Sequence, residues 1–287
     1  MNVRATLWRG FACLLPLIGA AQLSGQPSFV ATPLTELGLS QNYLGFSGGL
    51  YADGSNTMPA DHAAAGQARA AQIRPLDASG APSPDGKIVL ISVGMSHTTQ
   101  EFCAPNPQPC NPWSFIGQAA ADSSVNHTSL LIVNGAQGGK PAENWLLPTD
   151  PTYDYVRDVD LTPAGATEAQ VQIVWLKQAD PGPTQSLPSA SSDAYTLETY
   201  EADILRAIRV RYPNVRLVFV SNRSYAGYAN TTLNPEPYAY ESGFAVKWLI
   251  QAQIDQMANG GAIVDPRAGD LNYNTVAPWI AWAPYLW

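Results

Sequence analysis

Ser96 is the residue whose type and position most directly suggest catalysis. It follows an apolar, β-branched run, residues 88–93, after the short link Gly94-Met95. A serine held in a tight turn at the end of a buried strand can expose its hydroxyl, and a nucleophilic serine also needs a nearby base and donors for an oxyanion. Serines at strand ends also cap helices, and do so more commonly than they catalyse, so position alone leaves both interpretations open.

Two further apolar runs end in residues that fit the same chemistry. These residues are Gly138 and Gly139 after the run 129–134, and Lys177, Gln178 and Asp180 after the run 171–176. Bare backbone amides and a side-chain amide beside a serine hydroxyl are the groups that stabilise an oxyanion. The alternatives are that the glycine pair only forms a turn and that Gln178 only makes hydrogen bonds within its loop.

The pattern of apolar runs predicts an α/β fold of three layers. The three runs above and a fourth, residues 215–221, are almost continuously hydrophobic, as strands buried on both faces are. Helical patterns occupy residues 195–213 and 240–261, and the first carries its apolar residues on one stripe. Alternating strands and helices predict a mostly parallel sheet covered on both faces, with ligands at the carboxyl ends of the strands.

The first 25 residues have the layout of a secretory signal peptide. Arg4 and Arg9 precede an apolar segment from Phe11 to Leu23, which is too short to span a bilayer comfortably. Residues 26–86 contain many turn-forming residues, which predicts an irregular N-terminal arm with at most a short helix near residues 63–71. We expect residues 87–287 to form the domain that carries the candidate catalytic residues. We therefore expect a secreted or periplasmic protein without a membrane span.

Composition argues against several classes of partner. The net charge of -8 and the estimated pI of 4.8 disfavour a nucleic-acid-binding surface. Gly48-Gly49 lacks the Gly-Lys-Ser/Thr ending of a phosphate loop, and no pair of Cys and His residues has the spacing of metal ligands. We expect no cofactor, no metal, and a small-molecule or carbohydrate ester as partner.

Cys103 and Cys110 are the two cysteines outside the predicted signal peptide. In an oxidising compartment, a local disulfide between them is the natural expectation. Free thiols, or a bond to a partner outside this chain, are the alternatives.

The strand-end segments "VGMSHTTQEF", "NGAQGGKPAENW" and "VWLKQAD" resemble, in that order, the first three sequence blocks of the SGNH (GDSL-type) hydrolases. The resemblance covers roughly residues 86–223, and the sialate O-acetylesterase-like carbohydrate esterases are the most similar group. It implies a flavodoxin-like sheet, Ser96 as nucleophile with Met95 in place of the family's aspartate, and Gly138 (or Gly139, one residue on) in the oxyanion hole. Gln178 takes the side-chain position of that hole, although Lys-Gln-Ala-Asp departs from the family's third block.

The family's general base is missing from its expected place. That base belongs to an Asp-x-x-His motif near the carboxyl terminus, yet no histidine follows His127. His97 adjoins Ser96 but should point away from it, so it is predicted to line the pocket and contact substrate. His127 precedes a strand at the opposite end of the sheet, and His62 lies in the arm. Lys177 could act as a base only if burial lowers its pKa strongly.

The segment after Asp270 is aromatic and uncharged, which is unusual for a chain end. We interpret the chain as a C-terminally truncated ester hydrolase with little activity, whose aromatic tail lacks a cover. Gly139 and Lys177 join His97 as predicted substrate-binding residues, and tyrosines of the segment 221–243 could form a sugar-stacking wall or only pack over the sheet edge. A catalytically dead carbohydrate-binding or scaffold domain is the alternative.

Overall fold

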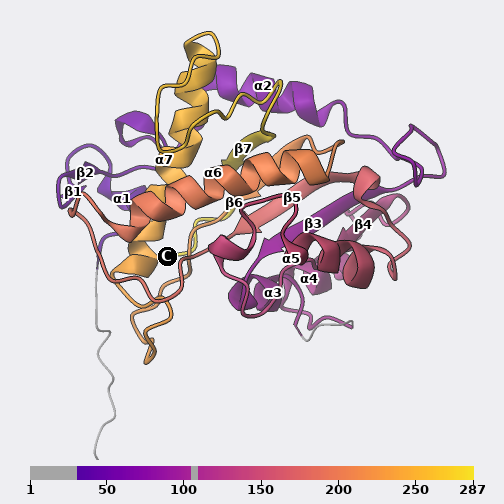
Figure 1. Ribbon diagram of the computed structural model, residues 1–287, viewed down its shortest axis with the longest axis horizontal. Helices are drawn as coiled ribbons and strands as arrows, with labels where there is room; N and C mark the ends of the chain where they lie inside the picture. Colours follow the sequence, from indigo (N-terminus) through magenta and orange to yellow (C-terminus); the bar gives the residue numbers. More distant parts are fainter. Residues whose placement is uncertain (1–30, 105–108) are drawn as a thin grey trace, which may run out of the picture.

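A five-stranded parallel sheet forms the centre of the molecule (Figure 1). The computed structural model describes residues 31–104 and 109–287, so the predicted signal peptide lies outside the described residues. The strand order is β4-β3-β5-β6-β7, which is the 2-1-3-4-5 order of a flavodoxin-like sheet. The strands are β3 (Ile88–Gly94), β4 (Leu130–Val133), β5 (Val171–Lys177), β6 (Leu217–Val220) and β7 (Trp279–Trp282).

All four predicted strands are confirmed, and the sheet has one more than predicted. The apolar segment near the chain end forms β7, which pairs in parallel with β6. The first residues of this strand are therefore packed: Trp279 is 5% exposed and Ile280 is fully buried. Their apolar character follows from their position in the sheet.

Helices and short turns connect the strands. Both predicted long helices are present, as α6 and α7. The helices are α1 (Leu34–Leu37), α2 (Ala60–Ala70), α3 (Ser96–Phe102), α4 (Phe115–Ala121), α5 (Pro151–Tyr155), α6 (Asp193–Arg211) and α7 (Tyr238–Ala258). The 3₁₀ turns are η1 (Ala52–Gly54), η2 (Ala142–Asn144) and η4 (Glu168–Gln170), and a π-helical turn, η3 (Val156–Leu161), extends α5.

Alternate strand residues point to opposite faces, which gives the three layers that the sequence predicted. Val89, Ile91 and Val93 of β3 pack against the layer formed by α5, α6 and α7. Leu90 faces the other way, into the apolar cluster around Phe102 of α3. On the face that Leu90 shares, α2 covers β6 and β7 at the other edge of the sheet.

One face of the sheet is incompletely covered. Between α2 and the α3–α4 pair lies an apolar groove of about 580 Å³. Its floor is formed by strand residues Leu90, Ile173, Trp175 and Phe219, and its rim includes Trp113, Phe115 and the tail residues Ala283, Pro284 and Leu286. Large apolar side chains are therefore accessible at this face, and Trp113 is 59% exposed.

The described part of the N-terminal arm, residues 31–86, holds more structure than predicted. It contains α1, a small hairpin of β1 (Asn42–Tyr43) and β2 (Phe46–Ser47), and α2. The Lys247 ammonium of α7 donates to the carbonyls of Ser47 and Gly48 at 2.8 and 2.6 Å. This contact fastens the Gly48-Gly49 turn to the domain.

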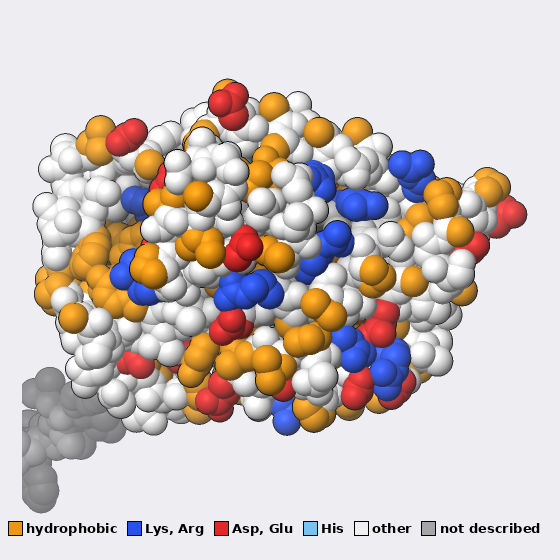
Figure 2. Space-filling view, turned by 45° about the horizontal axis from the view of Figure 1, so that its top comes forward, with side chains coloured by type: hydrophobic (Ala, Val, Ile, Leu, Met, Phe, Trp, Pro, Cys, Tyr) orange, Lys and Arg blue, Asp and Glu red, His pale blue; other side chains and the backbone are white. Residues whose placement is uncertain are grey.

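Charged side chains of both signs share the face of the molecule shown in Figure 2, separated by uncharged and hydrophobic ones. No helix within residues 31–104 and 109–287 is long and apolar enough to cross a bilayer.

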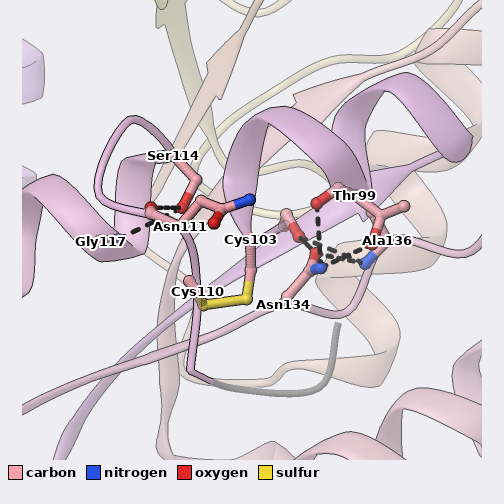
Figure 3. Close-up of a disulfide and its surroundings, with 9 residues drawn as sticks. Thr99, Cys103, Cys110, Asn111, Ser114, Gly117, Asn134 and Ala136 are labelled. Atoms are coloured by element: carbon pink, nitrogen blue, oxygen red, sulfur yellow. Dashed lines mark hydrogen bonds between the residues drawn. A yellow bond between two sulfur atoms is a disulfide. The ribbon is translucent and has the colours of Figure 1, made fainter. Parts of the chain in front are cut away.

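Cys103 and Cys110 are joined by a disulfide directly after α3 (Figure 3). The bond closes a short loop, because the two residues are only seven positions apart. Cys103 is buried beside Phe102 and Ile116, so the disulfide fixes the link between α3 and α4.

Removing this disulfide should destabilise the protein by about 2 kcal/mol, the chain-entropy contribution of a short closed loop. We expect dithiothreitol to lower the urea midpoint of the wild-type protein. The double variant Cys103→Ser/Cys110→Ser should start at the lower midpoint and show no response to reductant. Equal midpoints for the oxidised wild type and this variant would show that the bond adds no stability.

Candidate active site

Ser96 lies at the junction of β3 and α3, at the carboxyl edge of the sheet. Met95 is still extended, and Ser96 is the first residue of α3 and is exposed. Gly94 makes this sharp turn possible, because a Cβ on it would lie 2.3 Å from the Lys177 carbonyl oxygen and 2.4 Å from Thr98 Oγ1. The strand–turn–helix geometry that presents a serine is therefore present.

The neighbouring strand ends are level with this turn. Gly94 pairs with Lys177 in the parallel ladder, and the Gln137 N–H donates to the Gly94 carbonyl at 2.9 Å. A Cβ on Gly138 would lie 4.0 Å from the Cβ of Ser96, so the backbone of Gly138 passes beside the serine. The Gly138 N–H is not used in any hydrogen bond among the described residues. Gly139 follows in the left-handed region at φ 73° and is exposed.

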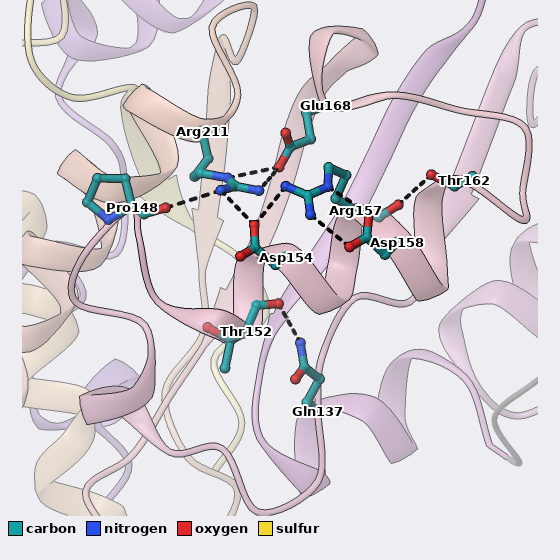
Figure 4. A network of polar contacts seen from close by, with 9 residues as sticks. All are labelled: Gln137, Pro148, Thr152, Asp154, Arg157, Asp158, Thr162, Glu168 and Arg211. Atoms are coloured by element: carbon teal, nitrogen blue, oxygen red, sulfur yellow. Dashed lines mark hydrogen bonds and ion pairs between the residues drawn. The ribbon is translucent and has the colours of Figure 1, made fainter.

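The loop that carries Gly138 is anchored to α5. The Gln137 side-chain amide donates to the Thr152 carbonyl of α5 at 2.9 Å (Figure 4). Helix α5 is held in turn by Arg211 of α6, which pairs with Asp154 of α5 and with Glu168 of η4. These contacts fix the Gly138 backbone relative to the sheet.

A second network holds α3 against the end of β4 (Figure 3). The Asn134 side-chain amide donates to Thr99 Oγ1 at 2.6 Å, and its oxygen accepts from the Ser92 hydroxyl at 2.7 Å. The Ala136 N–H donates to Ser92 Oγ at 3.2 Å. Ser96 is therefore carried on a helix whose inner face is tied to both flanking strands.

Ser96 opens into a cavity of about 380 Å³. His97 and Gln100 of α3, Arg223 after β6, and the segment 225–234 form the rest of its lining. The Asn234 amide donates to the Asp180 carbonyl at 3.2 Å, which ties this segment to the loop after β5.

The tyrosines of this region divide between the two roles predicted for them. Tyr225 and Tyr228 line the cavity and meet edge to face, with ring centroids 5.8 Å apart. Tyr240 is fully buried and donates to the Thr32 carbonyl, so it packs the arm against α7.

No histidine among the described residues makes a hydrogen bond to Ser96. His97 lines the cavity, and its Nδ1 accepts from the Arg223 guanidinium. His127 bonds to the Asp122 carbonyl before β4, at the opposite end of the sheet. His62 is buried against Trp279 and bonds to the Ile280 carbonyl, and burial lowers its pKa.

Lys177 is fully buried and paired. Its ammonium donates to both carboxylate oxygens of Glu101, at 2.7 and 2.6 Å, and to the Ser224 hydroxyl at 2.9 Å. Burial lowers the pKa of Lys177, and the Glu101 carboxylate opposes that shift. The ammonium thus lies in an ion pair that joins β5, α3 and the segment after β6, and not on the wall of the Ser96 cavity.

The substitution Glu101→Gln should destabilise the fold by about 3 kcal/mol, because it leaves the buried Lys177 ammonium without its counter-charge. Urea denaturation measures the change. The double variant Glu101→Gln/Lys177→Met should recover much of the loss, since it removes the uncompensated charge. A single variant within about 0.5 kcal/mol of wild type, as is usual for surface substitutions, would contradict this account.

Gln178 is also fully buried, and neither its amide nitrogen nor its oxygen has a hydrogen-bond partner among the described residues. It lies one residue beyond Lys177, level with Met95. Its role in an oxyanion hole stays a prediction.

The contacts of Glu101, Ser224 and Arg223 near the site were not predicted from the sequence. Lys177 is 76 residues from Glu101 and 47 from Ser224, so no local spacing signals their contact. Only the single acidic residue within "SHTTQEF" could have suggested a partner for a buried lysine.

Buried carboxyl groups gather behind the site, between the end of β5 and α6. Burial raises the pKa of Asp180 to about 7, with Asp193 and Glu143 adding to the effect. Glu201 is fully buried without a hydrogen bond to either carboxyl oxygen, and burial raises its pKa well above the usual range. Both groups favour their neutral forms. No cluster of His, Cys, Asp or Glu within the described part of the chain has the geometry to hold a metal ion.

Stability should therefore fall as pH rises from 5 to 8. The unfolded chain has already released these protons near pH 4, whereas in the folded protein the pKa of Asp180 is raised to about 7 and that of Glu201 well above its usual range. We expect Glu201→Gln to raise the free energy of unfolding at pH 8 by about 1 kcal/mol or more and to change it little at pH 5. The exposed control Glu36→Gln should show no such difference, and an equal effect of Glu201→Gln at both pH values would refute the explanation.

Comparisons with known proteins give weak likenesses. No known family model and no curated protein sequence matches the chain. A solved structure of the salicylyl-acyltransferase SsfX3 from a tetracycline biosynthetic pathway has 13% sequence identity and a TM-score of 0.34. That likeness covers 64% of this chain and 43% of the transferase, so the chain spans less than half of that protein. A structure described as a GDSL-like lipase from Parabacteroides merdae ATCC 43184 has 12% identity and a TM-score of 0.32, over 67% of this chain and 87% of the other.

Proposed function

We propose that the chain is a serine ester hydrolase of the SGNH type that acts on a small-molecule or carbohydrate ester. The observation that carries the proposal is the placement of Ser96. It is an exposed serine at a strand–helix turn, open to a cavity, with the unused N–H of Gly138 beside it. The resemblance of the three strand-end segments to SGNH blocks supports the same chemistry.

In the proposed reaction, Ser96 Oγ attacks the ester carbonyl carbon and its proton leaves to a base. The negative charge that develops on the carbonyl oxygen is met by the N–H groups of Gly138 and Ser96. Collapse of the tetrahedral intermediate breaks the bond to the alcohol, which departs with a proton and leaves an acyl group on Ser96. Water then attacks this acyl-enzyme, releases the acid and restores the hydroxyl.

The proposed activity of the chain is low, because the Ser96 hydroxyl has no hydrogen bond to a base among the described residues. His97 is the only histidine in the cavity, and its Nδ1 already accepts from Arg223. Loss of a general base typically slows such a reaction by several orders of magnitude, while oxyanion and binding contributions persist.

We also propose export from the cytoplasm. The signal-peptide layout of the first 25 residues motivates this proposal, and the Cys103–Cys110 disulfide supports an oxidising destination.

Exogenous imidazole should rescue the missing proton transfer. We expect the hydrolysis of 4-nitrophenyl acetate that depends on Ser96, taken as the rate of wild type minus that of Ser96→Ala, to rise about tenfold or more with added imidazole at pH 7.5. The variant supplies the background that imidazole produces by itself. Mass spectrometry of the Ser96 peptide after treatment with a fluorophosphonate provides a second readout. No Ser96-dependent rate at any imidazole concentration, together with no adduct, would overturn the proposal.

The second candidate is a carbohydrate-binding domain that has lost catalysis. It is favoured by the absence of a base on Ser96 and by the exposed aromatic ring of Tyr228 in the cavity wall. Saccharide binding that Tyr228→Ala abolishes, without any Ser96-dependent hydrolysis, would favour this candidate over the esterase.

A further inference from the structure

Arg223 is the one charged side chain among the described residues that line the Ser96 cavity. The other lining groups are hydroxyls, amides, small apolar side chains, tyrosine rings and the His97 imidazole. A single guanidinium thus lies beside the proposed nucleophile in an otherwise neutral cavity.

Within the described residues, no carboxylate forms an ion pair with this guanidinium. Its Nη1 donates to the His97 ring, and its buried Nε has no partner. Glu236 is the nearby acid that affects it electrostatically. The two Glu236 oxygens already accept from the N–H groups of Ala226 and Tyr240, at 2.7 and 2.9 Å.

The guanidinium remains charged despite its burial. Removal from water lowers the pKa of Arg223 only to about 10, so the group is protonated at neutral pH. A partly buried cation without an ion-pair partner carries a desolvation cost that a bound anion would offset.

We infer that Arg223 is an anion subsite of the Ser96 cavity and that it binds a carboxylate group of the ligand. Because this deepens the proposed function, the substrate class becomes an ester whose acyl or alcohol part carries a carboxylate. The planar guanidinium matches the geometry of a carboxylate, and its single charge balances one such group. His97 contacts Arg223 and directly follows Ser96 in α3, so the anion and the ester would share one cavity.

The binding of succinate and of its uncharged analogue succinamide tests this inference on the full chain. Isothermal titration calorimetry at low salt should show succinate binding about ten- to hundredfold tighter than succinamide. Sodium chloride should reduce this preference. Arg223→Gln should abolish it, whereas Arg209→Gln, which makes the same change of net charge on α6 outside the cavity lining, should leave it intact.

Equal affinities of the wild-type protein for the two compounds, or a succinate preference that persists in Arg223→Gln, would overturn the inference. Tighter binding of inorganic phosphate than of succinate would overturn the assignment to a carboxylate. Circular dichroism confirms that Arg223→Gln is folded. If Arg223→Gln does not fold, the affinities of the wild-type protein for succinate and succinamide test the inference. Arg223→Lys should then weaken succinate binding, because an ammonium cannot form the paired contact.

The carboxylate subsite and the esterase proposal can be tested independently of each other. Succinate binding is measured without catalysis, so its result does not depend on whether Ser96 hydrolyses an ester. A succinate preference without Ser96-dependent hydrolysis would support the subsite and reject the ester hydrolase. Ser96-dependent hydrolysis without a succinate preference would reject the subsite alone.

Discussion

The parallel register at Gly94 is the constraint on which the rest of the site depends. Gly94 pairs with Lys177 of β5 and accepts from the Gln137 N–H after β4, so three strand ends meet at one level. The turn into α3 fits there only without a side chain on Gly94. This close approach places Ser96 on the edge of the sheet and brings the backbone of Gly138 beside it.

Two cations beside this turn, the fully buried Lys177 and the partly buried Arg223, have opposite environments. Lys177 is enclosed by Glu101 and Ser224, and its three donors are all satisfied within the chain. Arg223 contacts the His97 ring, and its buried Nε has no partner among the described residues. Since a charge withdrawn from water costs more without a counter-charge than with one, the first is a structural link and the second is available to a ligand. The same physical rule thus separates a scaffold residue from a binding residue.

Much of the fold was predictable because its signals are local. Four of the five strands are continuous apolar runs, and α6 shows its stripe in the sequence. β7 was missed because Trp279–Trp282 lies in an aromatic segment that lacks the β-branched run found in the other strands. The covered state of its side chains depends on β6 and α2, which come from distant parts of the chain.

The candidate site divides in the same way. The places of Ser96 and Gly138 at neighbouring strand ends were predictable from the sequence, because a strand end is a local feature, whereas the role of Gln178 stays a prediction. Only the tertiary structure decided the roles of Glu101, Ser224 and Arg223. It also decided that Lys177 forms an ion pair. Charge pairing depends on distances of a few ångströms between residues tens of positions apart, and periodicity along a chain carries no record of such distances.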